Sequence, residues 1–151
     1  MAWLKRDGAA IEAIAVAAQI EDFDLLTEDL EAEYEGAWAG FGFDSSLDAI
    51  RKASPDETEV VVVCVSREDE DILDQPISVV KAAKEQGIKV LLIVDEISPK
   101  SMHTLMREGA DDFTPYPLPE GVFGDTMREL RGKVSNDTAG PRDKRAPGVL
   151  L

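Results

Sequence analysis

Apolar residues along the chain form short runs that alternate with stretches in which they recur every three or four positions. The most uniform run covers residues 59–65, where β-branched side chains leave no polar face, so we expect a strand at the centre of a parallel sheet. Shorter runs predict strands at residues 11–18, 38–43 and 88–94. The first of these is rich in alanine and is also compatible with the start of a helix; we expect a strand.

Between the runs, the spacing of apolar residues is typical of amphipathic helices. Residues 20–34 place Phe23, Leu26, Leu30 and Tyr34 on one face and acidic residues on the others. Two further helices are predicted by their caps: one capped by Ser45 or Ser46 and reaching Ala53, and one opened by Pro76 before Gly87. Two more helices are predicted by a starting residue followed by apolar residues on one face. One starts at Ser98 and has Met102, Leu105 and Met106 on that face. The other starts at Pro119 and has Phe123, Met127, Leu130 and Val134.

The alternation of strands and helices predicts an α/β fold, a three-layer α/β/α arrangement around a five-stranded parallel sheet with right-handed crossovers. We expect the domain to cover residues 11–134, after an N-terminal arm of residues 1–10. Residues 135–147 are polar and have the composition of a linker. Residues 148–151 look like the first residues of a strand, so we expect a following domain to begin there.

The charge of the chain is strongly acidic and unevenly placed. The formal net charge is -15, and residues 1–75 hold 5 Lys or Arg against 20 Asp or Glu, whereas residues 76–151 hold 11 of each. The acidic half would repel a phosphate backbone, which argues against nucleic-acid binding. A solvated acidic surface is favoured, and a basic or mixed-charge protein partner is permitted. The chain has no run of about 18 apolar residues and no signal peptide at its start, so we expect no membrane insertion.

Few residues offer chemistry of their own. A single Cys excludes an internal disulfide, and no Cys or His cluster has zinc-ligand spacing, so we expect no metal and no other cofactor. Cys64 is interpreted as a small buried residue and His103 as a helix-surface residue. The connection after residue 65 lacks the order and the glycine of an EF-hand, and we expect a solvated loop at its five acids: Glu68, Asp69, Glu70, Asp71 and Asp74.

Residues 106–118 have the composition of a sharp corner between a helix and a short strand. A glycine suited to a left-handed helix end precedes two acidic turn residues, and Phe113 is expected to start a buried strand that a proline closes. The corner residues are Gly109, Asp111, Asp112 and Pro117. This stretch resembles the fifth-strand corner of receiver domains, the CheY-like modules of two-component signalling, and the resemblance covers about 124 of the 151 residues.

The resemblance implies a sheet of strand order 2-1-3-4-5 and a corner whose X-Pro bond is often cis. In this family the residue before that proline is normally a Lys that contacts an aspartyl phosphate; here it is Tyr116. The family also needs a carboxylate nucleophile ending strand three and Ser or Thr after strand four. Alignment of the strands puts Cys64 at the nucleophile position and Val94 or Asp95 at the hydroxyl position.

Two acids that hold Mg²⁺ are required after the first strand of a receiver domain. The expected strand places Ala17 and Ala18 there. If the strand ends at Ile20 instead, Glu21 and Asp22 become the acidic pair. In either register the nucleophile and the Lys are missing, so we expect no aspartyl phosphate and no enzymatic activity.

A receiver shell without its phosphorylation residues, followed by a charged linker and the start of a second domain, resembles the N-terminal atypical receiver of TadZ/CpaE pilus-assembly proteins. These are relatives of MinD in which such a domain precedes a MinD/ParA-like ATPase. The resemblance implies a non-catalytic module of the Tad/Flp pilus system that forms homodimers and contacts pilus and secretion machinery, in the cytoplasm and at a cell pole. By position, the dimer face would be the solvent sides of residues 98–108 and 119–134.

Two other functions are compatible with the same pattern. The first is an active response-regulator receiver of a phosphorelay that controls an output domain. The second is a flavodoxin-like binder of a small molecule in the crevice at the strand ends. Phosphorylation would distinguish the first, and a thermal shift with flavin or nucleotides would distinguish the second.

Overall fold

The computed structural model describes residues 10–132, and the expectations for residues 1–9, for Val134 and for residues 135–151 lie outside the described part. The strands are β1 (Ala13–Val16), β2 (Trp38–Phe41), β3 (Val60–Ser66), β4 (Lys89–Asp95) and β5 (Asp112–Pro115). The α-helices are α1 (Asp24–Tyr34), α2 (Phe43–Lys52), α3 (Asp74–Glu85), α4 (Pro99–Arg107) and α5 (Val122–Arg131). Two short 3-10 helices, η1 (Ile20–Phe23) and η2 (Arg67–Ile72), precede α1 and α3.

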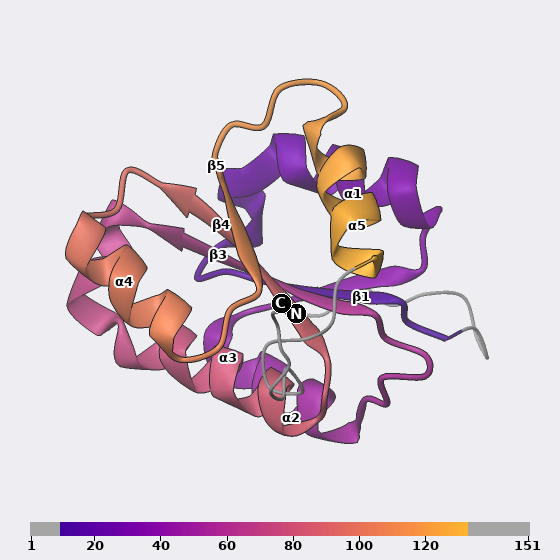
Figure 1. The fold of residues 1–151 in the computed structure, drawn as a ribbon, viewed down its shortest axis with the longest axis horizontal. Helices are drawn as coiled ribbons and strands as arrows, with labels where there is room; N and C mark the ends of the chain where they lie inside the picture. Colours follow the sequence, from indigo (N-terminus) through magenta and orange to yellow (C-terminus); the bar gives the residue numbers. More distant parts are fainter. Residues whose placement is uncertain (1–9, 133–151) are drawn as a thin grey trace, which may run out of the picture.

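The five strands form one parallel sheet in the order β2-β1-β3-β4-β5, which confirms the predicted α/β fold and its strand order. Helices α1 and α5 cover one face of the sheet, and α2, α3 and α4 cover the other (Figure 1). Among the helices of the described residues, none combines the length and the apolar character that a membrane span requires.

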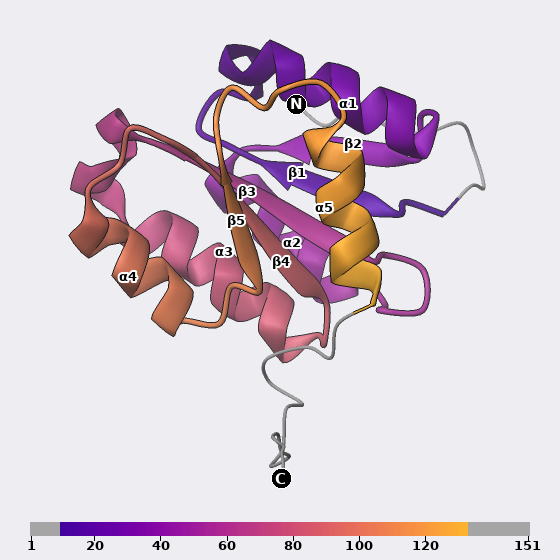
Figure 2. The same cartoon turned by 45° about the horizontal axis from the view of Figure 1, so that its top comes forward.

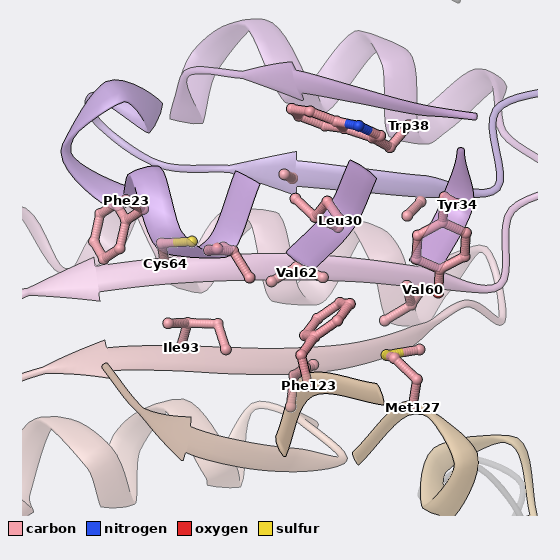
Figure 3. Close-up of a cluster of buried hydrophobic side chains, with 14 of the residues drawn as sticks. Phe23, Leu30, Tyr34, Trp38, Val60, Val62, Cys64, Ile93, Phe123 and Met127 are labelled. Atoms are coloured by element: carbon pink, nitrogen blue, oxygen red, sulfur yellow. The ribbon is translucent and has the colours of Figure 1, made fainter. Parts of the chain in front are cut away.

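The central strand β3 is buried on both faces, as its sequence predicted. Val60, Val62 and Cys64 pack in the cluster beneath α1 and α5, where Figure 3 shows them with residues of both helices. Val61 and Val63 point to the opposite face and join the cluster beneath α2, α3 and α4. Successive residues of a strand face opposite sides of the sheet. A strand covered by helices on both sides therefore has no position for a polar side chain.

Several element boundaries differ from those predicted. The first strand ends at Val16, residues 20–23 form a 3-10 helix rather than the first turn of α1, and α5 starts after the turn that Pro119 opens. Helix α3 begins at Asp74, before Pro76. Prolines favour the first turn of a helix but do not fix which residue of that turn they occupy.

The second strand is shorter than predicted, because the chain turns into α2 immediately after Phe41. Gly42, rather than Ser45 or Ser46, is the N-cap, and the Ser45 hydroxyl accepts a hydrogen bond from the Gly42 N–H at 3.1 Å. Phe43 is the first residue of α2, and its side chain is buried. It therefore continues the apolar pattern of the strand in the sequence although it belongs to the helix.

The corner after α4 has the predicted backbone. Gly109 has φ 124°, and a side chain there would meet the Lys84 Cγ atom at 2.9 Å, so only glycine fits. The Tyr116-Pro117 peptide bond is cis. The prediction that Phe113 lies in a buried strand is wrong: its side chain is 44% exposed, and Thr114 takes the covered side of β5. The reason is position, because β5 is the edge strand of the sheet, flanked by α4 and α5 (Figure 2).

Candidate functional site: the carboxyl edge of the sheet

The carboxyl ends of parallel strands form the edge where α/β proteins of this topology bind their ligands. The register brings the predicted positions together there: Val16 pairs with Val63, so Ala17 follows beside Cys64, and Val94 pairs with the residue that precedes Tyr116. Ala17, Cys64 and Val94 are 1%, 0% and 7% exposed, whereas Ala18 is exposed. These side chains carry no charge. The acids near this edge are Asp69, which acts on Cys64, and Asp95, the half-buried last residue of β4, whose charge acts on Tyr116.

Cys64 is a poor nucleophile in this environment. Burial is the main cause that raises the pKa of its thiol, and the neighbouring carboxylate of Asp69 adds to the effect. The thiol therefore stays protonated, and the chemistry of a cysteine requires the thiolate. The side chain packs in the same apolar cluster as Phe23 (Figure 3), which agrees with the interpretation of Cys64 as a small core residue.

Tyr116 lies over this edge and contacts helix α1. Its ring meets that of Phe23 edge to face, with the ring centroids 5.0 Å apart and the planes at 72°. The Leu25 N–H donates a hydrogen bond to the Tyr116 Oη atom at 3.1 Å. Burial raises the pKa of Tyr116, so the phenol stays neutral at physiological pH. The side chain in the position of the receiver lysine thus fills space with an uncharged ring.

Glu21 and Asp22 do not follow directly on the first strand. The strand ends at Val16, three residues separate it from the start of η1 at Ile20, and both acids are exposed on η1. The register in which the strand continues to Ile20 is therefore not the one observed. Within residues 10–132, there is no group of three or more His, Cys, Asp or Glu side chains that could hold a metal ion.

The acidic connection after β3 is more ordered than the predicted solvated loop. Asp69 is only 5% exposed, and its Oδ2 atom accepts hydrogen bonds from the N–H and the hydroxyl of Ser66 at 2.9 and 3.2 Å. Glu70 accepts a hydrogen bond from the Ser98 N–H, and this bond is the main cause that lowers the pKa of Glu70. Two of the five acids therefore cap backbone N–H groups of η2 and α4.

A second polar cluster lies at the opposite, amino end of the sheet, and sequence reasoning missed it. The Tyr34 hydroxyl donates to Glu59 Oε2 at 2.6 Å, and the guanidinium of Arg131 donates to both oxygens of Glu59 and to Glu33 Oε2. Burial by itself would raise the pKa of Glu59, but the hydrogen bonds from Arg131 and Tyr34 outweigh it and lower that pKa. This cluster ties α1 and α5 to the residue that precedes β3 and has the character of a structural ion pair.

Comparisons with known proteins agree with the fold. No family model matches the chain, and no curated protein matches it in sequence. The structure is similar to a pilus assembly protein, CpaE, from Burkholderia thailandensis (TM-score 0.58, 12% identity, covering 82% of this chain and 99% of the other). It is also similar to TadZ, a CheY-like protein from Pseudomonas aeruginosa (TM-score 0.57, 16% identity, 79% and 98%).

A third similar structure is a CheY-like response regulator from Mesorhizobium loti, with TM-score 0.55, 16% identity, and coverage of 80% of this chain and 98% of the other. Identities this low establish the architecture and carry no statement about activity. The chain therefore has the fold of the CheY-like receiver domains, as the strand order, the cis-proline corner and these similar structures show. The similar structures include CpaE and TadZ.

Proposed function

We propose that this domain is a non-catalytic, receiver-like interaction module of a TadZ/CpaE-like pilus-assembly protein. The observation that carries the proposal is Tyr116, which packs on Phe23 over the edge where a receiver needs a cation and a metal. Phosphoryl capture depends on charge neutralisation by the metal and the Lys while a carboxylate attacks. The apolar Ala17 and the protonated thiol of Cys64 supply neither.

The first experiment asks whether the domain can be phosphorylated. The purified protein would be incubated with acetyl phosphate and Mg²⁺ and examined by intact-protein mass spectrometry, beside a receiver domain with an intact aspartate as positive control. We expect an adduct on the control and none on this protein. A Mg²⁺-dependent, hydroxylamine-labile adduct would overturn the proposal and favour a phosphorelay receiver that controls an output domain.

Self-association is the second part of the proposal. Helices α4 and α5 flank the edge strand β5 (Figure 2), and the exposed ring of Phe113 lies on that strand. A large apolar side chain on an edge strand is an expected contact in a homodimer interface. We propose that the α4-β5-α5 face forms a symmetric dimer in which Phe113 is a central contact.

Light scattering after size-exclusion chromatography tests the dimer. Phe113→Ser should convert it to a monomer, whereas Leu25→Ser should not, because Leu25 is equally exposed, at 46% against 44%, but lies on α1. A monomeric parent protein at high concentration would contradict the proposal, and so would equal effects of the two substitutions.

Contact with pilus and secretion machinery and placement at a cell pole complete the proposal. The support is the structural similarity to pilus-assembly proteins from two genera, Burkholderia and Pseudomonas. The test is affinity purification and fluorescence imaging of the tagged full-length protein in its native host. Recovery of pilus-assembly components and a polar focus are expected; a diffuse signal with no such component would contradict this part.

A further inference from the structure

A groove of about 270 Å³ lies between helix α1 and the edge strand β2, on the far side of the sheet from β5. Ile20 and Trp38 provide its apolar surface. Four carboxylates surround that surface: Glu21, Asp24, Glu28 and Glu31. Among the described residues that line the groove, none is basic.

The helical repeat explains how the acids come to share one side of the groove. Asp24, Glu28 and Glu31 are spaced by four and three residues, so they project from the same face of α1. The Trp38 Nε1–H donates a hydrogen bond to Glu31 Oε1 at 3.0 Å, which fixes one carboxylate at the edge of the tryptophan ring. The ring itself is only 9% exposed and forms a firm floor rather than a free surface side chain.

The electrostatic environment favours a cationic occupant. Residues 20–38 contain eight acidic side chains and no Lys or Arg. Carboxylates at i,i+3 and i,i+4 positions of a helix repel one another, and Asp24, Glu28 and Glu31 have this spacing. A Lys or Arg placed between the rim acids would relieve the repulsion, whereas a nucleic acid or an anionic membrane would increase it.

We propose that this groove is a docking surface for a basic amphipathic segment of a partner protein. An aliphatic side chain of the segment packs on Ile20 and Trp38, and flanking Lys or Arg side chains pair with the rim carboxylates. The long methylene stems of Lys and Arg suit such a surface, since they cover apolar atoms while the charged head reaches the rim. The surface is separate from the α4-β5-α5 face, so dimerisation and this docking are compatible and can fail independently.

A fluorescein-labelled synthetic peptide that alternates Leu with Lys and Arg is the probe, and fluorescence anisotropy measures its affinity. Glu21→Gln combined with Glu28→Gln removes two rim charges. The control variant, Asp71→Asn combined with Glu85→Gln, removes two exposed charges from η2 and α3 and has the same net charge. We expect the rim variant to bind about threefold to tenfold more weakly than the control variant. A second peptide with Ser in place of Leu should bind more weakly than the first.

Three results would overturn the proposal. Equal weakening by the rim and control pairs would mean that the peptide responds only to the overall charge. Equal binding of the Leu and Ser peptides would mean that the apolar floor is not used, and Ile20→Ala should then also have no effect. Loss of self-association in the rim variant, seen by light scattering, would assign the groove to contact between copies of this chain. Circular dichroism of each variant confirms that it is folded.

Discussion

Asp111 is the corner residue for which the structure predicts most clearly how a substitution changes the free energy of unfolding. Its Oδ2 atom accepts a hydrogen bond from the Lys84 Nζ atom at 2.7 Å and another from the Val90 N–H at 2.8 Å. The side chains of Lys84 and Asp111 are 8% and 5% exposed, so both charges are withdrawn from water. The carboxylate therefore joins the end of α3, the start of β4 and the turn at Gly109.

Asp111→Ala removes the acceptor from two groups that remain in place. The Val90 N–H is buried, and leaving a buried donor unsatisfied costs about 1–3 kcal/mol. The Lys84 ammonium loses its ion pair with this carboxylate as well, and breaking a buried ion pair from one side costs about 3–5 kcal/mol in total. We expect the free energy of unfolding to fall by about 3–5 kcal/mol, a large part of the stability of a domain of this size.

Urea unfolding followed by circular dichroism measures this loss. The matched control is Asp48→Ala, which breaks an ion pair with Lys52 whose side chains are 75% and 76% exposed. That exposed pair should contribute at most about 0.5 kcal/mol. A double-mutant cycle that adds Lys84→Met should show a coupling of at least about 1 kcal/mol between positions 84 and 111.

The reasoning would be refuted if Asp111→Ala cost no more than the exposed control, or if the cycle showed no coupling. A cost no larger than that of the control would mean that water reaches the corner and that the ion pair is not confined as the exposures indicate. A large cost without coupling would assign the effect to the Val90 hydrogen bond alone and would remove Lys84 from the account.

Three further predictions concern residues at the carboxyl and amino edges of the sheet and rest on their pKa shifts and contacts. Cys64 should react with Ellman's reagent at pH 8 far more slowly in the native protein than in urea, because burial raises the pKa of the thiol; equal rates would show that it is accessible. Tyr116→Ala should lower the free energy of unfolding by about 1–3 kcal/mol, because the contact with Phe23 is lost. Tyr116→Phe should lower it less. If urea unfolding shows no loss for Tyr116→Ala, the ring is not packed. Because the folded-state pKa of Glu59 is lowered, its contribution to stability is present above its unfolded pKa and is lost as the pH falls through the folded pKa. Arg131→Met should therefore weaken the decline of stability on acidification, and an unchanged pH profile would contradict the role of this pair.

The sequence was sufficient to predict the fold because its signals are local and agree with one another. The uniform run in β3, the Ser98 cap of α4 and the glycine at position 109 each have one physical interpretation, and the Ser98 hydroxyl does accept the Ser101 N–H at 3.1 Å. Side-chain exposure on the edge strand β5 was less predictable. An apolar residue in such a strand can be buried or exposed, depending on which elements flank the strand, as Phe113 shows.

The polar contacts divide by distance along the chain. The bond from Ser66 to Asp69 spans three residues, and the pattern of a capping residue followed by an acid three positions later could have revealed it. The bond from Ser98 to Glu70 spans 28 residues, and that from Arg131 to Glu59 spans 72. No local pattern predicts those two, because they depend on how the strands are ordered in the sheet.

The carboxyl edge gives a physical reason why a receiver fold without phosphate chemistry, as proposed for this chain, would be stable. A carboxylate placed at the end of a central strand must be desolvated, which is costly unless a metal or a cation compensates it. At Cys64 that cost is absent, because a small apolar side chain extends the cluster that Val60 and Val62 begin. Tyr116 extends the same cluster from the other side by packing on Phe23. Under the proposed function, the absence of a charged nucleophile and the larger apolar core are two sides of one arrangement, in which Cys64 and Tyr116 fill the space with uncharged groups.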